Sequence, residues 1–412
     1  MHMKDEPCIT SQQEALLLNT PAPCISSFIL KVASRCNLNC SYCYVYNQAD
    51  STWKSRPPIM PDAVFEATLD RIRRHCIRSN QRTAHIQFHG GEPLLVGASR
   101  FGRWCERIRD VLSDTVTVEL GMQTNGSLLD EKWIEVLRAH DVLMGVSIDG
   151  PKDVHDAFRK DRKGRGSYER VEQGLRLLQC SNVPHRILSV IPLGSEPLKV
   201  HHHLVSLGSK SITYILPDFT HDNVASVRRL YGPTPCADFL IPIFDDWWFT
   251  GTLELIIRDL WNVARIILGG RSQIETFGNR PPHYVFIETD GEIEGLDCLR
   301  SCGEGISRIN LNVRHADFSD ILASPTMHGV AIFHGMPLPT GCLGCAERET
   351  CAGGYLPHRY SRAERFDNPS VWCADILEIF AHIRRRLGVP VEETQSRRTE
   401  LQNLDTNALN RC

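Results

Sequence analysis

Three cysteines near the start of the 412-residue chain have a spacing that suits an iron–sulfur cluster. Only three and then two residues separate Cys36, Cys40 and Cys43, so one loop can bring all three thiolates to one inorganic core. A [4Fe-4S] cluster normally takes four thiolates. With three, one iron keeps an open coordination position at which a substrate can bind and be reduced. A partial zinc site and reduced thiols are the alternative interpretations.

A second group of cysteines lies toward the C-terminus. Cys342, Cys345 and Cys351 follow one another closely, and Cys373 comes from further along the chain. Four thiolates would saturate a cluster, which favours electron transfer or structural support over substrate binding. A structural zinc site is the alternative here.

Composition narrows the range of partners and compartments. The formal net charge of −3 gives no reason to expect nucleic acid or an anionic membrane surface, so a small molecule or a peptide is the better-suited substrate. Sixteen cysteines without a secretion signal or a long apolar stretch predict a cytoplasmic protein, in which clustered cysteines bind metal or do chemistry. The length predicts a large domain with a smaller one.

Six short apolar segments alternate with amphipathic ones over the first half of the chain. Strands are predicted at 27–33, 84–88, 116–122, 142–148, 186–191 and 212–216, and helices near 62–77, 99–113, 130–140, 168–180 and 197–207. The first strand runs directly into the cysteine loop. Because strands that alternate with helices pair in parallel, the fold class is α/β, a partial (β/α)6 barrel. A complete eight-unit barrel is the alternative.

The alternation ends after residue 216. An aromatic run with Phe244, Trp247 and Trp248 predicts a helix-rich stretch whose rings pack in a core. Residues 283–291 predict a strand that ends in the Asp290-Gly291 turn, and a last helix is expected at 376–387. The expected organisation is an N-terminal arm (1–24), the barrel (25–235), a helical connector (236–282), a cysteine-rich auxiliary-cluster domain (283–388) and a disordered tail (389–412).

Polar side chains and glycines follow three successive strands, where a barrel of this type forms its active site. The second strand ends in His89-Gly90-Gly91-Glu92-Pro93, in which two glycines let the backbone approach a ligand and Glu92 can accept from an ammonium group. His89 is expected to be a packing or turn residue. The next two strand ends supply Gln123 and Asn125, then Ser147 and Asp149. Each motif alone is typical of a simple turn.

Together, the three-cysteine loop and these strand ends resemble the signature of radical S-adenosylmethionine (radical SAM) enzymes. The resemblance implies a [4Fe-4S] cluster on Cys36, Cys40 and Cys43, SAM as a further cofactor, and an external reductant of the flavodoxin or ferredoxin type. It also implies that a first set of residues binds the methionine part of SAM, namely Gly90, Gly91, Glu92 and Pro93. A second set would contact its sugar and carboxylate, namely Gln123, Asn125, Ser147 and Asp149.

The C-terminal cysteines resemble the SPASM extension, which carries auxiliary [4Fe-4S] clusters in radical SAM enzymes that modify peptides. The resemblance implies at least one auxiliary cluster on Cys342, Cys345, Cys351 and Cys373. The chain departs from the full pattern, since Tyr355 stands where a further cysteine is expected. Asp290 and Leu296 stand where other ligands would fall, and nearby Cys298 and Cys302 could be free thiols or replacement ligands. One auxiliary cluster is favoured over two.

Four segments resemble the FxsB-like and cyclophane-forming maturases of ribosomal peptides, at residues 28–35, 216–223, 351–361 and 366–373. This resemblance implies a 5′-deoxyadenosyl radical that abstracts a β-carbon hydrogen from a precursor peptide, after which the carbon bonds to an aromatic ring. The reaction ends with loss of a proton and an electron. The candidate proton acceptors are Asp218, His221, Asp222, Asp297 and Tyr355, and for any single one a surface or capping role is the alternative.

Other functions stay open at this point. A sulfatase-maturing radical SAM enzyme would oxidise a Cys or Ser side chain, although that family keeps the second auxiliary cluster whose ligands are missing here. A thioether or ether cross-link is another peptide reaction. A non-enzymatic metal-binding module would not need the Gly-Gly-Glu-Pro segment at a strand end.

Overall fold

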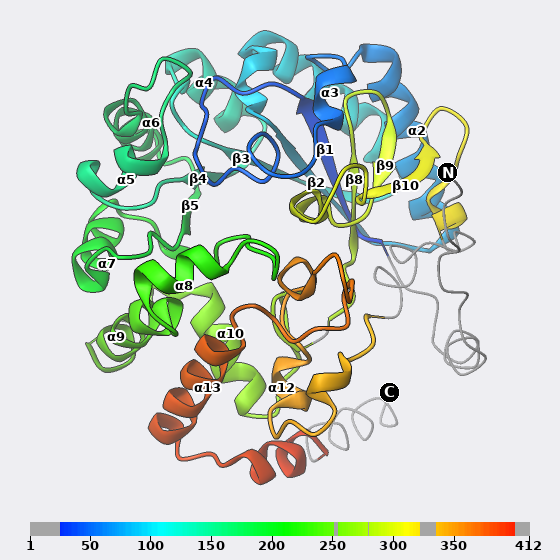
Figure 1. Ribbon diagram of the computed structural model, residues 1–412. Helices are drawn as coiled ribbons and strands as arrows, with labels where there is room; N and C mark the ends of the chain where they lie inside the picture. The colour runs from blue at the N-terminus through cyan, green and yellow to red at the C-terminus, as the bar shows by residue number, and fades with distance from the viewer. Residues whose placement is uncertain (1–24, 251–253, 279, 322–334, 400–412) are drawn as a thin grey trace, which may run out of the picture.

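A computed structural model describes residues 25–250, 254–278, 280–321 and 335–399 (Figure 1). The N-terminal arm expected at 1–24 lies outside these residues. The described part contains no helix that is long and apolar enough to cross a membrane.

Six parallel strands form the centre of the molecule and lie side by side in chain order. They are β1 (Ser27–Ala33), β2 (Thr83–Gly90), β3 (Thr117–Thr124), β4 (Leu143–Ser147), β5 (His185–Val190) and β6 (Ser211–Ile215). Because all six run in the same direction, their C-terminal ends meet at one edge of the sheet. The predicted (β/α)6 arrangement is confirmed, with strand bounds within a few residues of those expected.

Four short strands extend the sheet at its two edges. β7 (Ile256–Ile257) pairs with β6, and β8 (Tyr284–Ile287) pairs in parallel with β1. β9 (Glu292–Glu294) and β10 (Arg308–Asn312) continue from β8 as antiparallel strands. The turn between β8 and β9 contains Asp290 and Gly291, and Gly291 adopts the left-handed φ of +88° that this turn requires. The cysteine-rich half of the chain is therefore hydrogen-bonded to β1.

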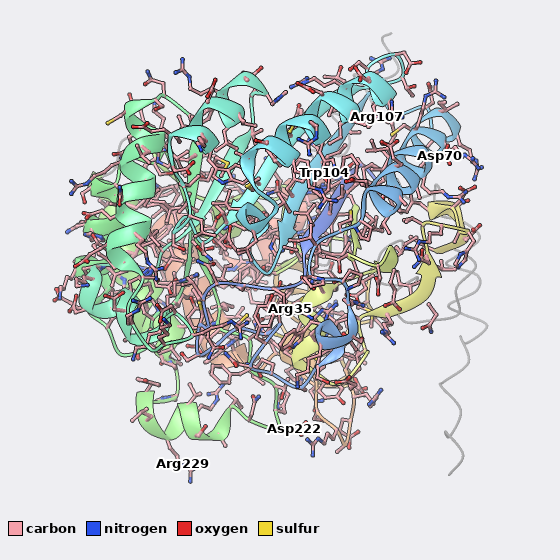
Figure 2. The ribbon with its side chains drawn as sticks, turned by 90° about the horizontal axis from the view of Figure 1, so that it is seen from above. Arg35, Asp70, Trp104, Arg107, Asp222 and Arg229 are labelled. Atoms are coloured by element: carbon pink, nitrogen blue, oxygen red, sulfur yellow. The ribbon has the colours of Figure 1, made fainter. Side chains whose placement is uncertain are left out.

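Helices cover the outer face of the parallel sheet (Figure 1). They are α2 (Asp62–Arg78), α3 (Ala98–Leu112), α4 (Glu131–Ala139), α5 (Lys152–Phe158), α6 (Tyr168–Cys180) and α7 (Pro197–Ser206). Phe65 of α2 stacks on Trp104 of α3 with ring centroids 4.6 Å apart, and both rings are buried. Burial of such a side chain contributes about 1.5 to 3 kcal/mol. Figure 2 shows Asp70 of α2 and Trp104 of α3 on these neighbouring helices.

A second helical layer joins the barrel to the cysteine-rich region. It contains α8 (Ala225–Tyr231), α9 (Pro235–Thr250), α10 (Arg258–Ile267) and α13 (Cys373–Leu387), and α9 packs against α7 and α13. Phe244 is buried and stacks on Trp248, which confirms a core role for the aromatic run. Residues 391–399 are helical and Thr394 is buried, so the disordered tail expected from residue 389 is wrong for this stretch. The rest of that tail, 400–412, lies outside the described residues.

Candidate active site

The three N-terminal cysteines lie on the loop that leaves the C-terminal end of β1. The amide of Leu38 donates to Sγ of Cys36 at 3.3 Å, and the amide of Cys43 donates to the carbonyl of Cys40 at 3.1 Å. Burial and the carboxylate of Glu92 raise the pKa of Cys36, and Cys40 and Cys43 raise it further. The three thiols thus interact electrostatically, and a cationic iron core would relieve their mutual repulsion. The loop therefore fits the [4Fe-4S] cluster implied for it.

A buried carboxylate fastens this loop to the barrel. Oδ2 of Asp149 accepts hydrogen bonds from Oη of Tyr42 at 2.5 Å and from Nε of Arg159 at 2.9 Å. Its other oxygen accepts from the amide of Val190 at 3.2 Å, and the side chain is fully buried. With both oxygens occupied, Asp149 is placed to hold the loop against the ends of β4 and β5. This position suits a scaffold better than the direct SAM contact expected from the sequence.

Glu92 is likewise enclosed by donors from its own chain. Its carboxylate accepts from the amide of Leu94 at 3.0 Å, from Oγ1 of Thr124 at 2.6 Å and from the amide of Asn125 at 2.8 Å. Burial raises its pKa to about 7, although these hydrogen bonds act in the opposite direction. The side chain joins the end of β2 to the end of β3, so it holds the Gly-Gly-Glu-Pro segment in place.

The two glycines of that segment lie directly against the cysteine loop. The amide of Gly91 donates to the carbonyl of Ala33 at 2.7 Å, and the amide of Glu92 donates to the carbonyl of Arg35 at 2.9 Å. A Cβ atom on Gly91 would overlap the carbonyl of Arg35, and Gly90 has a φ of +139° that disfavours any side chain. This close fit explains why two glycines stand here. Pro93 is buried and begins a 3-10 turn immediately afterwards.

Three further strand-end residues expected to contact SAM lie together beside the cysteine loop. Nε2 of Gln123 donates to Oγ of Ser147 at 2.9 Å, which joins the ends of β3 and β4. Nδ2 of Asn125 donates to Oδ1 of Asn37 at 2.9 Å and lies 3.7 Å from Sγ of Cys36. The structure thus brings Gln123, Asn125 and Ser147 to one edge of the barrel, next to the first cluster ligand. His89 packs edge-on against Phe286, as expected of a packing residue.

One of the five candidate proton acceptors, Asp297, is buried beside the cysteine loop. It begins the 3-10 helix η3 (Asp297–Ser301), and its Oδ2 lies 2.8 Å from Nζ of Lys31 and 2.8 Å from Oη of Tyr44. Burial raises its pKa, but the charge of Lys31 and hydrogen bonds from Lys31 and Tyr44 outweigh burial and leave the pKa below its ordinary value. Asp297 is therefore an ionised carboxylate at neutral pH.

Sequence reasoning missed Lys31 and Tyr44. A signal for Lys31 was present, because it is the single charged residue within the apolar segment 27–33. A lysine in a buried strand needs a counter-charge, and that requirement could have directed attention to an acidic partner. Tyr44 directly follows the third cysteine and gave no comparable signal.

The remaining four candidate acceptors have other partners. Oδ1 of Asp218 lies 3.4 Å from Nε2 of His358, and Asp222 accepts from the exposed amide of Arg362. The ring of His221 contacts the carbonyl of Pro369, and Oη of Tyr355 lies 2.6 Å from Sγ of Cys298. None of these arrangements places an ionised carboxylate in a buried site beside the first cysteine loop.

The four C-terminal cysteines line one small cavity of about 20 Å³. Cys342 ends the 3-10 turn η5 (Thr340–Cys342), Cys351 ends α12 (Arg348–Cys351) and Cys373 begins α13. Burial raises the pKa of Cys351 to about 12, and the neighbouring Cys373 and Cys342 contribute in the same direction. Cys345 completes the lining. Four converging thiols with an apolar wall fit a saturated auxiliary [4Fe-4S] cluster.

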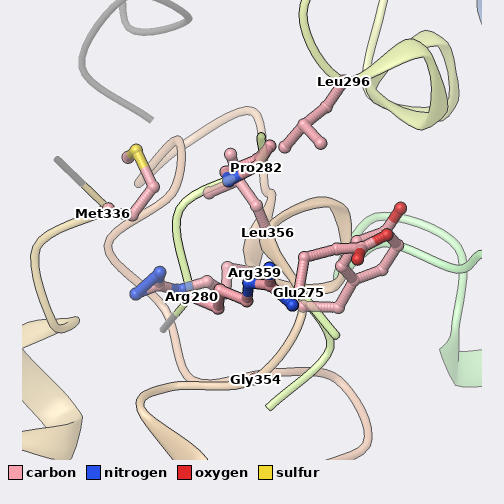
Figure 3. A pocket seen from close by; sticks show the side chains of 10 residues that line it. Glu275, Arg280, Pro282, Leu296, Met336, Gly354, Leu356 and Arg359 are labelled. Carbon is pink, nitrogen blue, oxygen red and sulfur yellow. The ribbon is translucent and has the colours of Figure 1, made fainter. Parts of the chain in front are cut away.

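A different cavity, of about 30 Å³, lies where the missing auxiliary ligands were expected (Figure 3). Its wall includes Glu275, Leu296, Met336, Tyr355 and Leu356, and no cysteine of the described residues lines it. Cys298 and Cys302 are buried in an apolar cluster with Leu296, Leu299, Leu356, Tyr360 and Phe366. The described residues around this cavity therefore offer no thiolate to a further cluster from the wall itself.

The chain matches the Radical SAM superfamily and is similar to anaerobic sulfatase-maturating enzymes. The model of the Radical SAM superfamily matches residues 30–206, which hold the barrel and the first cysteine group. The cysteine-type anaerobic sulfatase-maturating enzyme of Clostridium perfringens is 26% identical over 373 residues, 89% of this chain and 98% of that enzyme. The serine-type enzyme of Klebsiella aerogenes is 30% identical over 363 residues, 85% of this chain and 84% of that enzyme.

Solved structures share the fold. The structure of anSMEcpe with bound AdoMet superposes with a TM-score of 0.76 at 24% identity and covers 90% of this chain and 99% of that chain. Streptococcus suis SuiB bound to its precursor peptide SuiA gives a TM-score of 0.52 at 14% identity and covers 81% of this chain and 72% of that chain.

The barrel, its three-thiol loop and the superfamily match together define a radical SAM enzyme. The identity and coverage shared with the Klebsiella aerogenes enzyme are more specific, and the chain belongs to the family of anaerobic sulfatase-maturating enzymes. It is an oxidoreductase that acts on a peptide or protein. Its cofactors are SAM, a [4Fe-4S] cluster in the barrel and at least one auxiliary [4Fe-4S] cluster.

This family corrects the functional hypothesis drawn from the sequence. Cyclophane formation by an FxsB-like maturase was wrong, because the sulfatase-maturating relatives match the barrel and the cysteine-rich region together over most of the chain. The FxsB-like resemblance rested on four short segments. Oxidation of a Cys or Ser side chain was ranked second because ligands of the second auxiliary cluster are missing from the sequence. The relatives support this alternative better than cyclophane formation.

Proposed function

We propose that the protein oxidises a Cys or Ser side chain of a peptide or protein substrate to an aldehyde, in the manner of its sulfatase-maturating relatives. The observation that carries this proposal is the ionised carboxylate of Asp297, buried beside the cysteine loop with Lys31 and Tyr44 as its donors. An oxidation of this kind must remove a proton from the substrate thiol or hydroxyl. Asp297 is placed and charged to accept that proton.

The proposed oxidation removes two hydrogens from the substrate side chain. The Cβ of the substrate loses one hydrogen atom, its thiol or hydroxyl loses a proton, and one electron leaves, so that a carbon–sulfur or carbon–oxygen double bond forms. When bound, the first cluster with SAM supplies the 5′-deoxyadenosyl radical that takes the hydrogen atom, and the auxiliary cluster supplies an electron acceptor. A thioaldehyde from Cys then exchanges its sulfur for oxygen with water and releases hydrogen sulfide.

The residues of this chain bind and orient the reactants. Gly90, Gly91 and Pro93 present the backbone against which the methionine part of SAM would lie, while Glu92 holds that segment in place. Gln123, Asn125 and Ser147 offer the polar groups for the rest of SAM, and Asp149 fixes the cysteine loop. The first cluster is held by Cys36, Cys40 and Cys43, and the auxiliary cluster by Cys342, Cys345, Cys351 and Cys373.

The protein works with one auxiliary cluster in this proposal. Tyr355 and Leu296 occupy expected ligand positions, and no cysteine of the described residues lines the cavity beside them. A protein electron carrier of the flavodoxin or ferredoxin type supplies the electron that starts each turnover. The substrate is a ribosomally made chain whose target residue is a Cys or a Ser, since relatives of both types match.

Three peptides that differ only at the target position, as Cys, Ser or Ala, test the proposal with the anaerobically reconstituted enzyme. We expect an aldehyde, trapped by a hydrazine probe and located by mass spectrometry, from the Cys or the Ser peptide and not from the Ala peptide. The Asp297→Asn variant should still form 5′-deoxyadenosine and should lose the aldehyde. A wild-type product that carries a cross-link and no aldehyde would contradict the proposal.

A further inference from the structure

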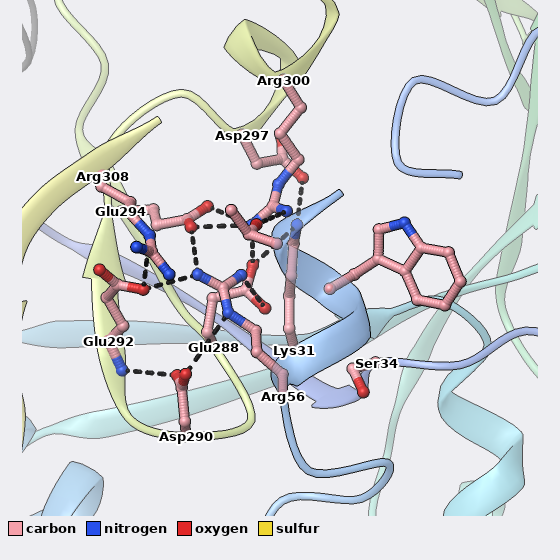
Figure 4. Close-up of polar contacts among 12 residues, drawn as sticks. Lys31, Ser34, Arg56, Glu288, Asp290, Glu292, Glu294, Asp297, Arg300 and Arg308 are labelled. Carbon is pink, nitrogen blue, oxygen red and sulfur yellow. Dashed lines mark hydrogen bonds and ion pairs between the residues drawn. The ribbon is translucent and has the colours of Figure 1, made fainter. Parts of the chain in front are cut away.

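Asp297 lies at the edge of a buried network of charged side chains (Figure 4). Three cations and four carboxylates in it are each less than 5% exposed: Lys31, Arg56, Arg300, Asp50, Glu288, Glu294 and Asp297. The carboxylates outnumber the cations by one, so the loss of any cation would leave two unbalanced negative charges in the interior. Such charges are costly unless each has a specific partner.

The two arginines of the network serve three of the four carboxylates. Arg300 lies within 2.8 Å of oxygens of Asp50, Glu288 and Glu294. Arg56 reaches Glu288 at 2.8 Å and Glu294 at 2.7 Å. Glu288 and Glu294 would therefore each keep two arginine partners if Lys31 were removed.

Asp297 depends on Lys31 for its counter-charge. Lys31 is its single ion-pair partner within the described residues, with Nζ 2.8 Å from Oδ2, and the same Nζ lies 3.1 Å from Glu288. The ammonium group also lies over the ring of Phe286, 5.3 Å from its centroid. Nζ of Lys31 thus reaches from β1 to the ring of Phe286 on β8. It pairs with Asp297, the one of the four carboxylates that has no ion pair with Arg56 or Arg300.

Other titratable groups face Asp297 from each neighbouring element. Tyr44 donates from the cysteine loop, the ring of His89 lies close by on β2, and Tyr284 approaches from β8. Cys298 is the adjacent residue of η3, and its own pKa is raised by burial and then by the charge of Asp297. Among these groups Lys31 alone carries a permanent positive charge, because burial lowers the pKa of His89 to about 4 and keeps that ring neutral.

We propose that Lys31 is a positioning residue that keeps Asp297 ionised and holds its carboxylate in the orientation needed to accept the substrate proton. The inference rests on the proposed function, since it gives Asp297 the proton-accepting role. The ammonium group of Lys31 pairs with Asp297 and Glu288 among the described residues. It acts through one oxygen of Asp297, and the hydrogen bonds found for that carboxylate among the described residues all reach this same oxygen, Oδ2.

Infrared titration of the reconstituted enzyme tests this coupling without any substrate. The carbonyl band of the protonated Asp297 carboxyl is assigned as the band that Asp297→Asn removes. In Lys31→Met its midpoint should move to higher pH by about 1 to 3 pH units, the usual effect of removing a nearby opposite charge. Lys31→Arg should restore a low midpoint. Lys199→Met removes an exposed lysine paired with Asp153 and should leave the band unchanged.

Product formation then shows whether the coupling matters to the reaction. At a pH one unit below its new midpoint, Lys31→Met should form about tenfold less aldehyde than it does well above that midpoint, because only about a tenth of the Asp297 carboxyl is ionised there, while 5′-deoxyadenosine still accumulates. Aldehyde formation should recover as the pH is raised, which a general structural defect would not produce. If Lys31→Met fails to fold, as its melting temperature will show, Lys31→Gln is measured in its place.

The outcomes separate the two proposals. An unchanged carboxyl band in the folded variant would overturn the role of Lys31, whatever the substrate is. A shifted band with an aldehyde yield equal to that of the wild type at every pH would overturn it as well. A shifted band in an enzyme that makes no aldehyde from Cys or Ser peptides would leave the link to Asp297 standing and refute the proposed function.

Discussion

The hydroxyl of Tyr355 lies 2.6 Å from the sulfur of Cys298. Tyr355 occupies the position four residues after Cys351 at which a cluster ligand was expected, and Cys298 is a buried thiol that could have replaced a missing ligand. Burial raises the pKa of Cys298, and the nearby Asp297 raises it further. The sulfur of Cys298 contacts a phenol hydroxyl inside an apolar cluster, which leaves it poorly placed to bind a metal.

This relationship predicts the iron content of two cysteine variants. Cys298→Ala and Cys302→Ala should each keep about eight irons per chain, the content of two [4Fe-4S] clusters. Cys345→Ala should fall to about four, because it loses a ligand of the auxiliary site. Iron and sulfide analysis after anaerobic reconstitution measures all three. A loss of about four irons in Cys298→Ala or Cys302→Ala would show that these thiols hold a cluster.

Replacing the three barrel cysteines together should separate the two clusters. The variant with Cys36, Cys40 and Cys43 all changed to Ala should not cleave SAM reductively and should retain about four irons at the auxiliary site. Chromatography of 5′-deoxyadenosine gives the activity, and iron analysis gives the occupancy. Formation of 5′-deoxyadenosine at the wild-type rate would refute the assignment of these ligands.

Two aspartates with different surroundings provide a matched pair for the proton-transfer step. Asp297→Asn should reduce aldehyde formation by about 100-fold or more, since a general base contributes about 10² to 10⁴ in rate. Asp222→Asn changes an aspartate that accepts from the Arg362 amide and should leave the rate within about twofold. Single-turnover assays of product and 5′-deoxyadenosine measure both variants. Equal losses in the two would argue against a specific role for Asp297.

The carboxylate of Asp149, which holds the cysteine loop against the barrel, should stabilise the folded protein. Asp149→Asn leaves the buried guanidinium of Arg159 without its counter-charge, and breaking a buried pair in this way costs about 3 to 5 kcal/mol. Denaturant unfolding of Asp149→Asn should show this loss, whereas Asp153→Asn on the exposed end of α5 should be nearly neutral. Equal stabilities of the two variants would mean that the Arg159 charge has another partner.

Acid should weaken the fold through the network around Asp297. The pKa of Glu294 is lowered to about 2, since the charges of Arg300 and Arg56 outweigh the effect of burial, and the pKa of Asp297 is lowered as well. A carboxyl with a lowered folded-state pKa contributes stability above its ordinary pKa of about 4 and loses it as the pH falls toward the folded-state value. Tryptophan fluorescence should therefore report a falling unfolding free energy from about pH 4.5 downward. In Arg300→Met this pH dependence should be smaller, and an equally steep fall would contradict the assignment.

The alternation of apolar segments was enough to predict the parallel barrel, because each strand is buried and each helix has one apolar face. The cluster ligands inferred from short-range cysteine patterns stay predictions, although the structure brings the four C-terminal cysteines to one small cavity. The sequence could not reveal the contact between Lys31 and Asp297, which are 266 residues apart and meet because β8 pairs with β1. Glu92 and Asp149 were correctly placed at strand ends, but their hydrogen bonds to the chain itself depend on tertiary packing that no local pattern encodes.

The pairing of β8 with β1 means that the barrel cannot be treated as a separable module. Residues 27–30 of β1 lie between β2 on one side and residues 284–287 of β8 on the other. A chain cut before residue 283 would expose the backbone amides and carbonyls of β1 along an apolar edge, which is a template for edge-to-edge association with other chains. Attempts to express the first 282 residues alone would then yield aggregates, and a soluble version would need a charged residue or a proline introduced on that edge.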